Sequence, residues 1–127
     1  MDESFFISTA LALKIHQQQV LRFGGTDGIR DHGLLESAIG APRQTWDYTH
    51  DIYQAAAQYC YSITNNHPFL DGNKRTATAC MLVFLVKNGI TPKMSNADLY
   101  DWVIAITTNT MHRDELAELL RKQSNVM

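Results

Sequence analysis

The run from Ala77 to Val86 constrains the fold more than any other stretch, because every residue in it except Thr78 is apolar. A helix that is apolar on all sides has to be covered by protein on all sides. Gly89, just beyond the run, is typical of the residue that follows a helix C-terminus. The sequence therefore predicts a central helix over about residues 73–88, with other helices packed around it.

Five further helices are predicted from apolar residues that recur at three- and four-residue spacing. They cover about residues 8–23, 31–39, 51–66, 95–106 and 110–120. The expected N-caps are Asp31, Asp51, Ser95 and Thr110. Pro42 is expected just beyond the end of the second helix, and no run alternates long enough to predict a core strand. The expected fold is a compact all-α bundle of about six helices, forming a single domain over residues 1–127.

One stretch, residues 42–50, shows no clear helical period and mixes aromatic with polar side chains. It predicts a short flap, either a loop or a β-hairpin. If Trp46 and Tyr48 are exposed, they suit an interaction surface, since aromatic rings are enriched in the cores of interfaces. The alternative, in which the two rings cover the edge of the core, is equally open.

Charge and cysteine content exclude some classes of protein. With 11 Lys and Arg against 13 Asp and Glu the net charge is -2, which argues against general binding of nucleic acid or membranes. Cys60 and Cys80 lie in apolar helical patterns without metal-ligand spacing, so both are expected to be reduced and buried. No apolar stretch approaches the ~20 residues of a membrane span, and acidic Asp2 and Glu3 stand where a signal peptide is basic. A soluble cytoplasmic protein is expected.

Polar residues are concentrated directly before the central helix, in the nine residues His67–Arg75. Pro68 interrupts the preceding helical pattern and Asp71-Gly72 is a turn signal, so residues 73–75 fall in the first turn of the central helix. That turn offers free backbone N–H groups and the positive end of the helix dipole, next to the two cations Lys74 and Arg75. The sequence therefore predicts an anion site at this helix start.

These residue types suit phosphoryl or nucleotidyl transfer. His67, at a helix end, is placed to take a proton from a hydroxyl. Asp71 is placed to hold magnesium together with phosphate oxygens, which is a common way for proteins to bind Mg²⁺. Lys74 and Arg75 can neutralise charge that grows on the transferred group, and Asn73 can donate to a phosphate or orient the loop.

A purely structural alternative stays open on residue types alone. In it Asp71 pairs with Arg75, and His67 caps the preceding helix. His16, a lone histidine in the first predicted helix, is expected to be a hydrogen-bonded structural residue rather than a catalyst.

The stretch from His67 to Arg75 resembles the motif HPFx(D/E)GNGRxxR of the Fic family. It is still more similar to the death-on-curing (Doc) toxin branch, whose pattern is HxFx(D/N)(A/G)NKR. Similarity to this branch continues through Gly24-Gly25, Gly28–Asp31, Gly33–Ala38 and Phe84–Gly89. The resemblance thus spans about residues 16–90.

The resemblance implies the all-α Fic fold, with ATP and Mg²⁺ as ligands. It makes His67 the general base on a hydroxyl of a protein target, assisted by Lys74 and Arg75. It makes Asp71 the carboxylate linked to magnesium, and the phosphate-binding residues Gly72, Asn73, Lys74 and Arg75. It also makes residues 42–50, with Arg43, Gln44, Thr45 and Trp46, a flap that docks the target by strand addition.

Two departures from the Fic pattern bear on which phosphate moves. Lys74 stands where typical Fic enzymes have glycine, and Thr78 stands where they have a final arginine that helps to hold the distal phosphates of ATP. Both changes disfavour AMP transfer. In the Doc branch the γ-phosphate of ATP goes to a threonine of elongation factor Tu, which arrests translation. The resemblance therefore implies a protein kinase toxin, with AMP transfer and a catalytically inactive antitoxin-binding module as the alternatives.

Fic enzymes often carry an inhibitory helix with the pattern (S/T)xxxE(G/N). This sequence has no Ser or Thr with Glu four residues later, and Thr110 with Asp114 comes nearest. The resemblance implies that a small antitoxin supplies the inhibitor instead, through a C-terminal segment that folds onto the toxin in trans. Antitoxins of this kind bind DNA through a separate domain, so no direct contact of this chain with nucleic acid is expected.

Overall fold

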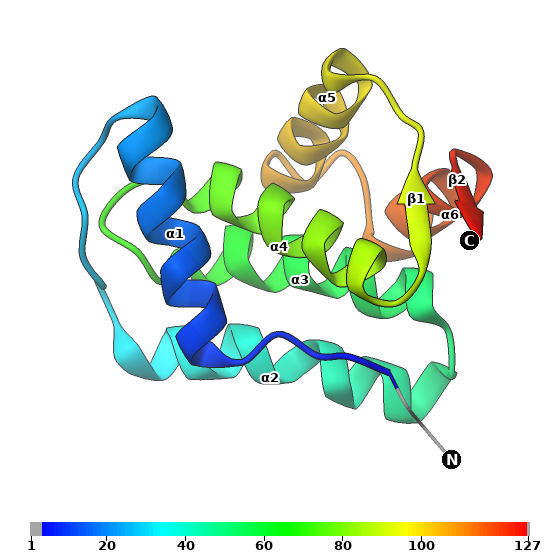
Figure 1. Ribbon diagram of the computed structural model, residues 1–127, viewed down its shortest axis with the longest axis horizontal. Coiled ribbons are helices and arrows are strands. Elements are labelled where there is room, and N and C mark those ends of the chain that lie inside the picture. Colours follow the sequence, from blue (N-terminus) through cyan, green and yellow to red (C-terminus); the bar gives the residue numbers. More distant parts are fainter. Residues whose placement is uncertain (1–3, 127) are drawn as a thin grey trace.

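In the computed structural model, which describes residues 4–126, α4 (Asn73–Lys87) runs through the middle of a helical bundle (Figure 1). The other elements are α1 (Thr9–Phe23), α2 (His32–Thr49), α3 (Ile52–Asn66), β1 (Ile90–Pro92), α5 (Asn96–Thr107), α6 (Arg113–Lys122) and β2 (Ser124–Val126). Helix α3 packs along both α2 and α4, and α1 crosses α4 on another side. The predicted all-α fold with six helices is confirmed over these residues.

Local capping explains where most helices begin. The side chains of Asp31, Asp51 and Ser95 accept hydrogen bonds from backbone N–H groups in the first turns of α2, α3 and α5, as predicted. The predicted cap of the last helix is wrong. Helix α6 begins after His112, whose N–H donates to the Glu115 carboxylate, while the Thr110 hydroxyl donates back to the Ala105 carbonyl.

The predicted flap at residues 42–50 is also wrong, because α2 continues through Pro42 to Thr49. A proline inside a helix has no N–H to give to the carbonyl four residues earlier, here Ala38. The hydroxyl of Ser62 on α3 lies 2.8 Å from that carbonyl and 2.7 Å from the Gln58 carbonyl of its own helix, so it offers the Ala38 carbonyl a shared donor in place of the missing N–H. A donor from the neighbouring helix thus removes the main reason for the helix to stop at Pro42.

Helix α4 is less enclosed than its composition predicts. Ala77, Cys80 and Phe84 are fully buried, but Val86 is 50% exposed. Three more apolar residues of the helix, Ala79, Leu82 and Val83, are only partly buried. One apolar stripe of the central helix therefore faces outward.

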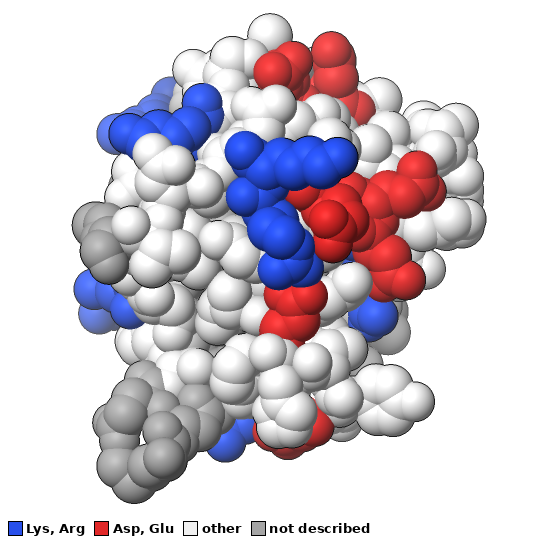
Figure 2. Space-filling model, turned by 90° about the vertical axis from the view of Figure 1, so that its right-hand side faces the viewer, with Lys and Arg blue, Asp and Glu red and all other residues white. Residues whose placement is uncertain are grey.

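The only strands in residues 4–126 are β1 and β2, which pair antiparallel with Ile90 opposite Val126. The pair holds the C-terminal segment Ser124–Val126 against the residues that follow α4. On the face seen in Figure 2, a group of basic side chains lies directly beside a group of acidic ones. Arg121 on α6 pairs with Glu118 on the same helix and with the α3 cap Asp51.

Two further expectations can be compared with the structure. Cys60 and Cys80 are free and buried, as predicted, and burial raises the pKa of each thiol to about 12. Within the described part of the chain, no helix is both long and apolar enough to cross a membrane.

Candidate active site

His67 lies at the junction between α3 and the motif loop. Its backbone is left-handed, with φ 52°, and its N–H donates to the Ile63 carbonyl, so it closes the C-terminus of α3. The guanidinium of Arg30 donates to the His67 carbonyl at 2.6 Å and to the Asn66 carbonyl at 2.8 Å. Arg30 thereby satisfies carbonyls that a helix end leaves free, and it fixes the backbone from which the exposed His67 ring projects.

Asn73, only 4% exposed, connects that ring to the start of α4. Its Oδ1 accepts from the Phe69 N–H, and its Nδ2 donates to the Phe69 carbonyl, both at 3.0 Å. These two bonds identify which atom of the Asn73 amide is the oxygen and which is the nitrogen. Nδ2 also lies 3.0 Å from Nδ1 of His67, so Nδ1 must be the acceptor. The neutral His67 ring therefore carries its proton on Nε2.

Asp71 is exposed, and backbone groups hold its carboxylate. One oxygen accepts from the Thr26 N–H at 3.2 Å and the other from the Gly72 N–H at 2.8 Å. These two hydrogen bonds, in that order of importance, hold the pKa of the Asp71 carboxyl below its ordinary value. The side chain is therefore ionised at neutral pH. Gly25 allows this arrangement, since a Cβ at that position would lie 2.8 Å from the carboxylate.

The N-terminus of α4 has the features of an anion site. Its N-cap is Gly72, with φ 75°, so no side chain accepts from the first-turn N–H groups. Lys74 and Arg75 project from this turn and are exposed, and no carboxylate within residues 4–126 forms an ion pair with the Lys74 ammonium. Arg75 lies over the Phe23 ring, 4.6 Å from its centroid.

The structural alternative is thus partly right. His67 does cap the preceding helix, but through its backbone N–H, while its ring accepts a hydrogen bond from the Asn73 amide. The Asp71 carboxylate accepts hydrogen bonds from backbone N–H groups and does not form the expected pair with Arg75.

Segment 24–31, between α1 and α2, supports the motif loop from outside. The Leu70 N–H donates to the Gly28 carbonyl, and the Arg30 N–H donates to the Pro68 carbonyl at 2.7 Å. A Cβ on Gly28 would lie 2.9 Å from the Leu70 side chain. The sequence showed these glycines only as part of a family resemblance, so their role in holding the loop was missed.

The four residues expected to dock a target are not near the motif. They lie on the C-terminal half of α2, whereas the motif loop joins α3 to α4 at the opposite end of the bundle (Figure 1). Arg43 stacks on the Phe6 ring and pairs with Asp47, and Thr45 is buried. Trp46 meets His50 edge to face, and Gln44 lines a hollow.

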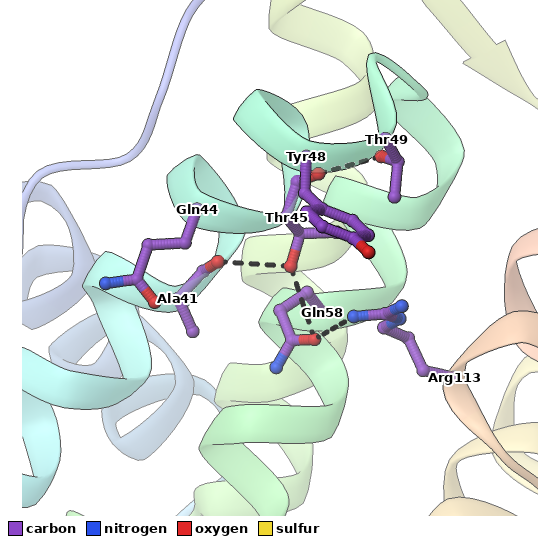
Figure 3. Close-up of a pocket in the computed structure, with 7 residues that line it drawn as sticks. All are labelled: Ala41, Gln44, Thr45, Tyr48, Thr49, Gln58 and Arg113. Atoms are coloured by element: carbon purple, nitrogen blue, oxygen red, sulfur yellow. Dashed lines mark hydrogen bonds between the residues drawn. The ribbon is translucent and has the colours of Figure 1, made fainter.

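That hollow, of about 420 Å³, lies between α2, α3 and α6 (Figure 3). Its polar groups are directed at one another. The Thr45 hydroxyl lies against the Ala41 carbonyl and the Gln58 amide, and Arg113 donates to the same amide oxygen at 2.9 Å. The hydrogen bonds in the hollow therefore connect the three helices to one another. None of the motif residues lines it.

Within the described residues, no group of three or more His, Cys, Asp or Glu side chains is arranged to hold a metal ion. Asp71 nevertheless fits a role in binding magnesium together with phosphate. It is ionised and exposed, and each of its oxygens accepts a single N–H and so keeps acceptor capacity.

The part of the chain that resembles known proteins includes the whole of this site. Residues 6–85 match the family model described as Fic/DOC family. The chain is 30% identical over 118 residues to the protein kinase doc of Escherichia phage P1, across 91% of this chain and 93% of that protein. It is 40% identical over 73 residues to the toxin Doc of Mycolicibacterium smegmatis, across 55% of this chain and 56% of that protein.

Proposed function

Because the chain belongs to the Fic/DOC family, we propose that it is a Doc-type toxin of a toxin–antitoxin pair that transfers the γ-phosphate of ATP to a serine or threonine hydroxyl of a protein. One observation carries the proposal. A single loop holds the exposed ring of His67 beside the N-terminus of α4, where the cap residue Gly72 has no side chain. Phosphoryl transfer to a hydroxyl needs a group that takes the proton and a group that holds the phosphate, and this loop offers both.

His67 is the proposed general base. The lone pair of its neutral ring lies on Nδ1, which faces the Asn73 amide at 3.0 Å. In the proposed reaction Nδ1 leaves that amide and takes the proton of the target hydroxyl. The Asn73 amide is then the hydrogen-bond partner that the target hydroxyl replaces at Nδ1.

The phosphates of ATP are proposed to lie at the start of α4. The N–H group of Asn73 and the side chains of Lys74 and Arg75 would bind their oxygens. The Gly72 N–H, which meets the Asp71 carboxylate in this structure, would bind a phosphate oxygen in exchange for that carboxylate. Asp71 would hold Mg²⁺ jointly with the phosphates, and the bound ion would supply positive charge against the charge of the transferred group. The cap without a side chain and the exposed carboxylate support this assignment.

Two residues support γ-phosphate transfer over AMP transfer. Lys74 adds a long side chain at the helix start, where typical Fic enzymes have glycine and bring a phosphate close to the backbone. Thr78, at the position of the final Fic arginine, uses its hydroxyl to donate to the Lys74 carbonyl at 2.8 Å. A charged clamp for the distal phosphates is therefore missing at that position.

The proposed target is a threonine of elongation factor Tu, as the resemblance to the Doc branch implies. The target hydroxyl has to approach His67 from solvent. Residues 24–27 are exposed and lie along the motif loop, which the Thr26 N–H contacts through Asp71. We propose that this segment, rather than residues 42–49, borders the bound target.

A cognate antitoxin is the proposed partner, with its C-terminal segment bound to this chain. The outward stripe of α4, formed by Ala79, Leu82, Val83 and Val86, gives that segment apolar surface to cover. Leu21 and Phe23 at the end of α1 are also exposed, and Phe23 lies against Arg75. A segment bound here would extend to the edge of the site.

Expression in growing cells tests the proposed toxicity. The wild-type chain should arrest growth when expressed alone, and His67→Ala should not. His50→Ala is a matched control, because His50 is also an exposed histidine that closes a helix with left-handed backbone, φ 51°. Growth arrest by His67→Ala at the same soluble level would support the inactive binding module, and normal growth with the wild-type chain would contradict a toxin.

A further inference from the structure

His16 of α1 is 1% exposed and lies against the inner side of the motif loop. Its ring stacks on Phe69, with the ring centroids 3.9 Å apart and the planes 6° apart. Its Nε2 lies 2.8 Å from the carbonyl oxygen of Asp71. Since that oxygen can only accept, Nε2 is the donor. A Cβ on Gly72 would lie 3.7 Å from the same nitrogen, so the ring also lies beside the N-cap residue of α4.

The bond to Asp71 fixes the direction of a peptide group. A trans peptide holds its C=O and N–H on opposite sides. With the Asp71 C=O directed inward at His16, the Gly72 N–H is directed outward, where it meets the Asp71 carboxylate at 2.8 Å. The Gly72 N–H thus lies on the same side as the proposed phosphate site.

The alternative orientation of this peptide is accessible to the chain. Gly72 has φ 75°, and a glycine adopts positive and negative φ about equally readily. If the Asp71–Gly72 peptide turned over, a carbonyl oxygen would face the anion site and an N–H would face the interior. The site would then repel a phosphate at the point where it should bind one.

Segment 24–31 closes this arrangement from the other side. Nδ1 of His16 lies 3.5 Å from an Asp27 oxygen, and the neighbouring Thr26 N–H holds the Asp71 carboxylate. The two ends of the Asp71 residue, its carbonyl and its carboxylate, are therefore held by α1 and by the loop that follows α1.

We propose that His16 is a positioning residue, whose Nε2–H holds the Asp71–Gly72 peptide in the one orientation that directs the Gly72 N–H at a bound phosphate. The proposal rests on the proposed function for its phosphate, but the peptide orientation itself can be observed in the protein without nucleotide. His16 does not touch the reacting atoms. It acts through the backbone of the loop, and its loss should weaken phosphate binding while leaving the His67 ring in place.

The direct test is nuclear magnetic resonance on the wild-type chain. Three-bond couplings between the amide proton and the α protons of Gly72 report its φ, and nuclear Overhauser effects from the same amide proton report which side it faces. The ¹⁵N shifts of the His16 ring report which nitrogen carries a proton. We expect one outward direction for the N–H and a protonated Nε2. An unprotonated Nε2, or a Gly72 N–H directed inward, overturns the proposal without any substitution.

Substitutions then separate the hydrogen bond from the packing. His16→Gln retains a donor at a similar reach, and His16→Phe retains the flat ring on Phe69 but has no donor. Gln17→Ala, on the exposed side of the same helix, is the control. With a non-hydrolysable ATP analogue as the probe, His16→Phe should bind on the order of tenfold more weakly, and His16→Gln should recover most of that loss.

The outcomes distinguish the two proposals. Equal Gly72 couplings and equal analogue binding in His16→Phe and the wild type would overturn the positioning role. If His16→Phe does not fold, the wild-type couplings and the affinity of His16→Gln still decide. Failure of the wild type to bind the analogue at all would contradict the proposed function, while the couplings would still test the orientation of the peptide.

Discussion

The amide nitrogen of Asn73 lies 3.0 Å from Nδ1 of His67, and the same amide makes both of the hydrogen bonds that Phe69 offers from its backbone. One buried side chain in the first turn of α4 therefore orients the His67 ring at the end of α3. It also fixes the backbone of the loop between the two helices. This explains how a chemically active histidine can stand in an exposed, left-handed position without losing its orientation.

Asn73→Ala should destabilise the protein and disorder the site. It leaves the buried N–H and C=O of Phe69 without their partners, which should lower the free energy of unfolding by about 2–3 kcal/mol. Asn65→Ala is the control, since Asn65 is exposed and makes a single bond to the Tyr61 carbonyl. Urea denaturation measures both variants, and equal stability for the two would contradict the role given to Asn73.

Gly25→Ala should displace the Asp71 carboxylate. A Cβ on Gly25 would lie 2.8 Å from that carboxylate, whereas one on Gly24 would meet nothing within 4 Å. Both glycines have positive φ, at 112° and 85°, so both substitutions strain the backbone and only one adds a clash. Gly25→Ala should therefore lose far more nucleotide-dependent activity than Gly24→Ala, measured at equal folded fraction. Similar losses would show that strain alone is responsible.

The continuation of α2 through Pro42 can be tested with a double-mutant cycle. Ser62→Ala removes the donor to the Ala38 carbonyl and should destabilise the protein by about 1–2 kcal/mol. Pro42→Ala restores a backbone N–H to that carbonyl, so Ser62→Ala should cost about 1 kcal/mol less in the Pro42→Ala background. Strict additivity of the two substitutions would contradict this account of the helix.

These results show which parts of the fold a sequence can reveal. Asp31, Asp51 and Ser95 were predictable as N-caps because a cap bonds to residues two or three positions away. Pro42 was misread because its missing hydrogen bond is replaced from Ser62, on another helix. Nothing in the sequence around Pro42 indicates that donor, and the mixed polar and aromatic residues after it suggested a flap.

The candidate site also contains residues that local sequence could reveal and residues that depend on the tertiary fold. His67, Asp71, Gly72 and Asn73 lie in one short stretch of sequence, so their place between a helix end and a helix start was predictable. The residues that hold them, His16, Gly25 and Arg30, come from α1 and the segment after it. His16 was expected to be structural, which agrees with its buried hydrogen bond, but its contact with Asp71 depends on the tertiary fold.

Lowering the pH should reduce the free energy of unfolding through protonation of Asp71. The pKa of its carboxyl is lower in the folded protein than in the unfolded chain, so the carboxylate contributes stability above the ordinary carboxyl pKa. That contribution is lost as the pH falls through the lowered folded pKa. The difference in unfolding free energy between the wild type and Asp71→Asn should therefore shrink as the pH falls from about 5 towards about 3. A difference that stays constant or grows over this range would contradict the assignment.

The most direct test of the central claim is transfer of label from ATP to purified elongation factor Tu. Parallel reactions contain ATP labelled at the γ-phosphate or at the α-phosphate, with the wild type, His67→Ala or His50→Ala. We predict that label enters the target only from γ-labelled ATP, with the wild type and His50→Ala but not with His67→Ala. Label that enters only from α-labelled ATP would contradict γ-phosphate transfer and identify the protein as an AMP transferase.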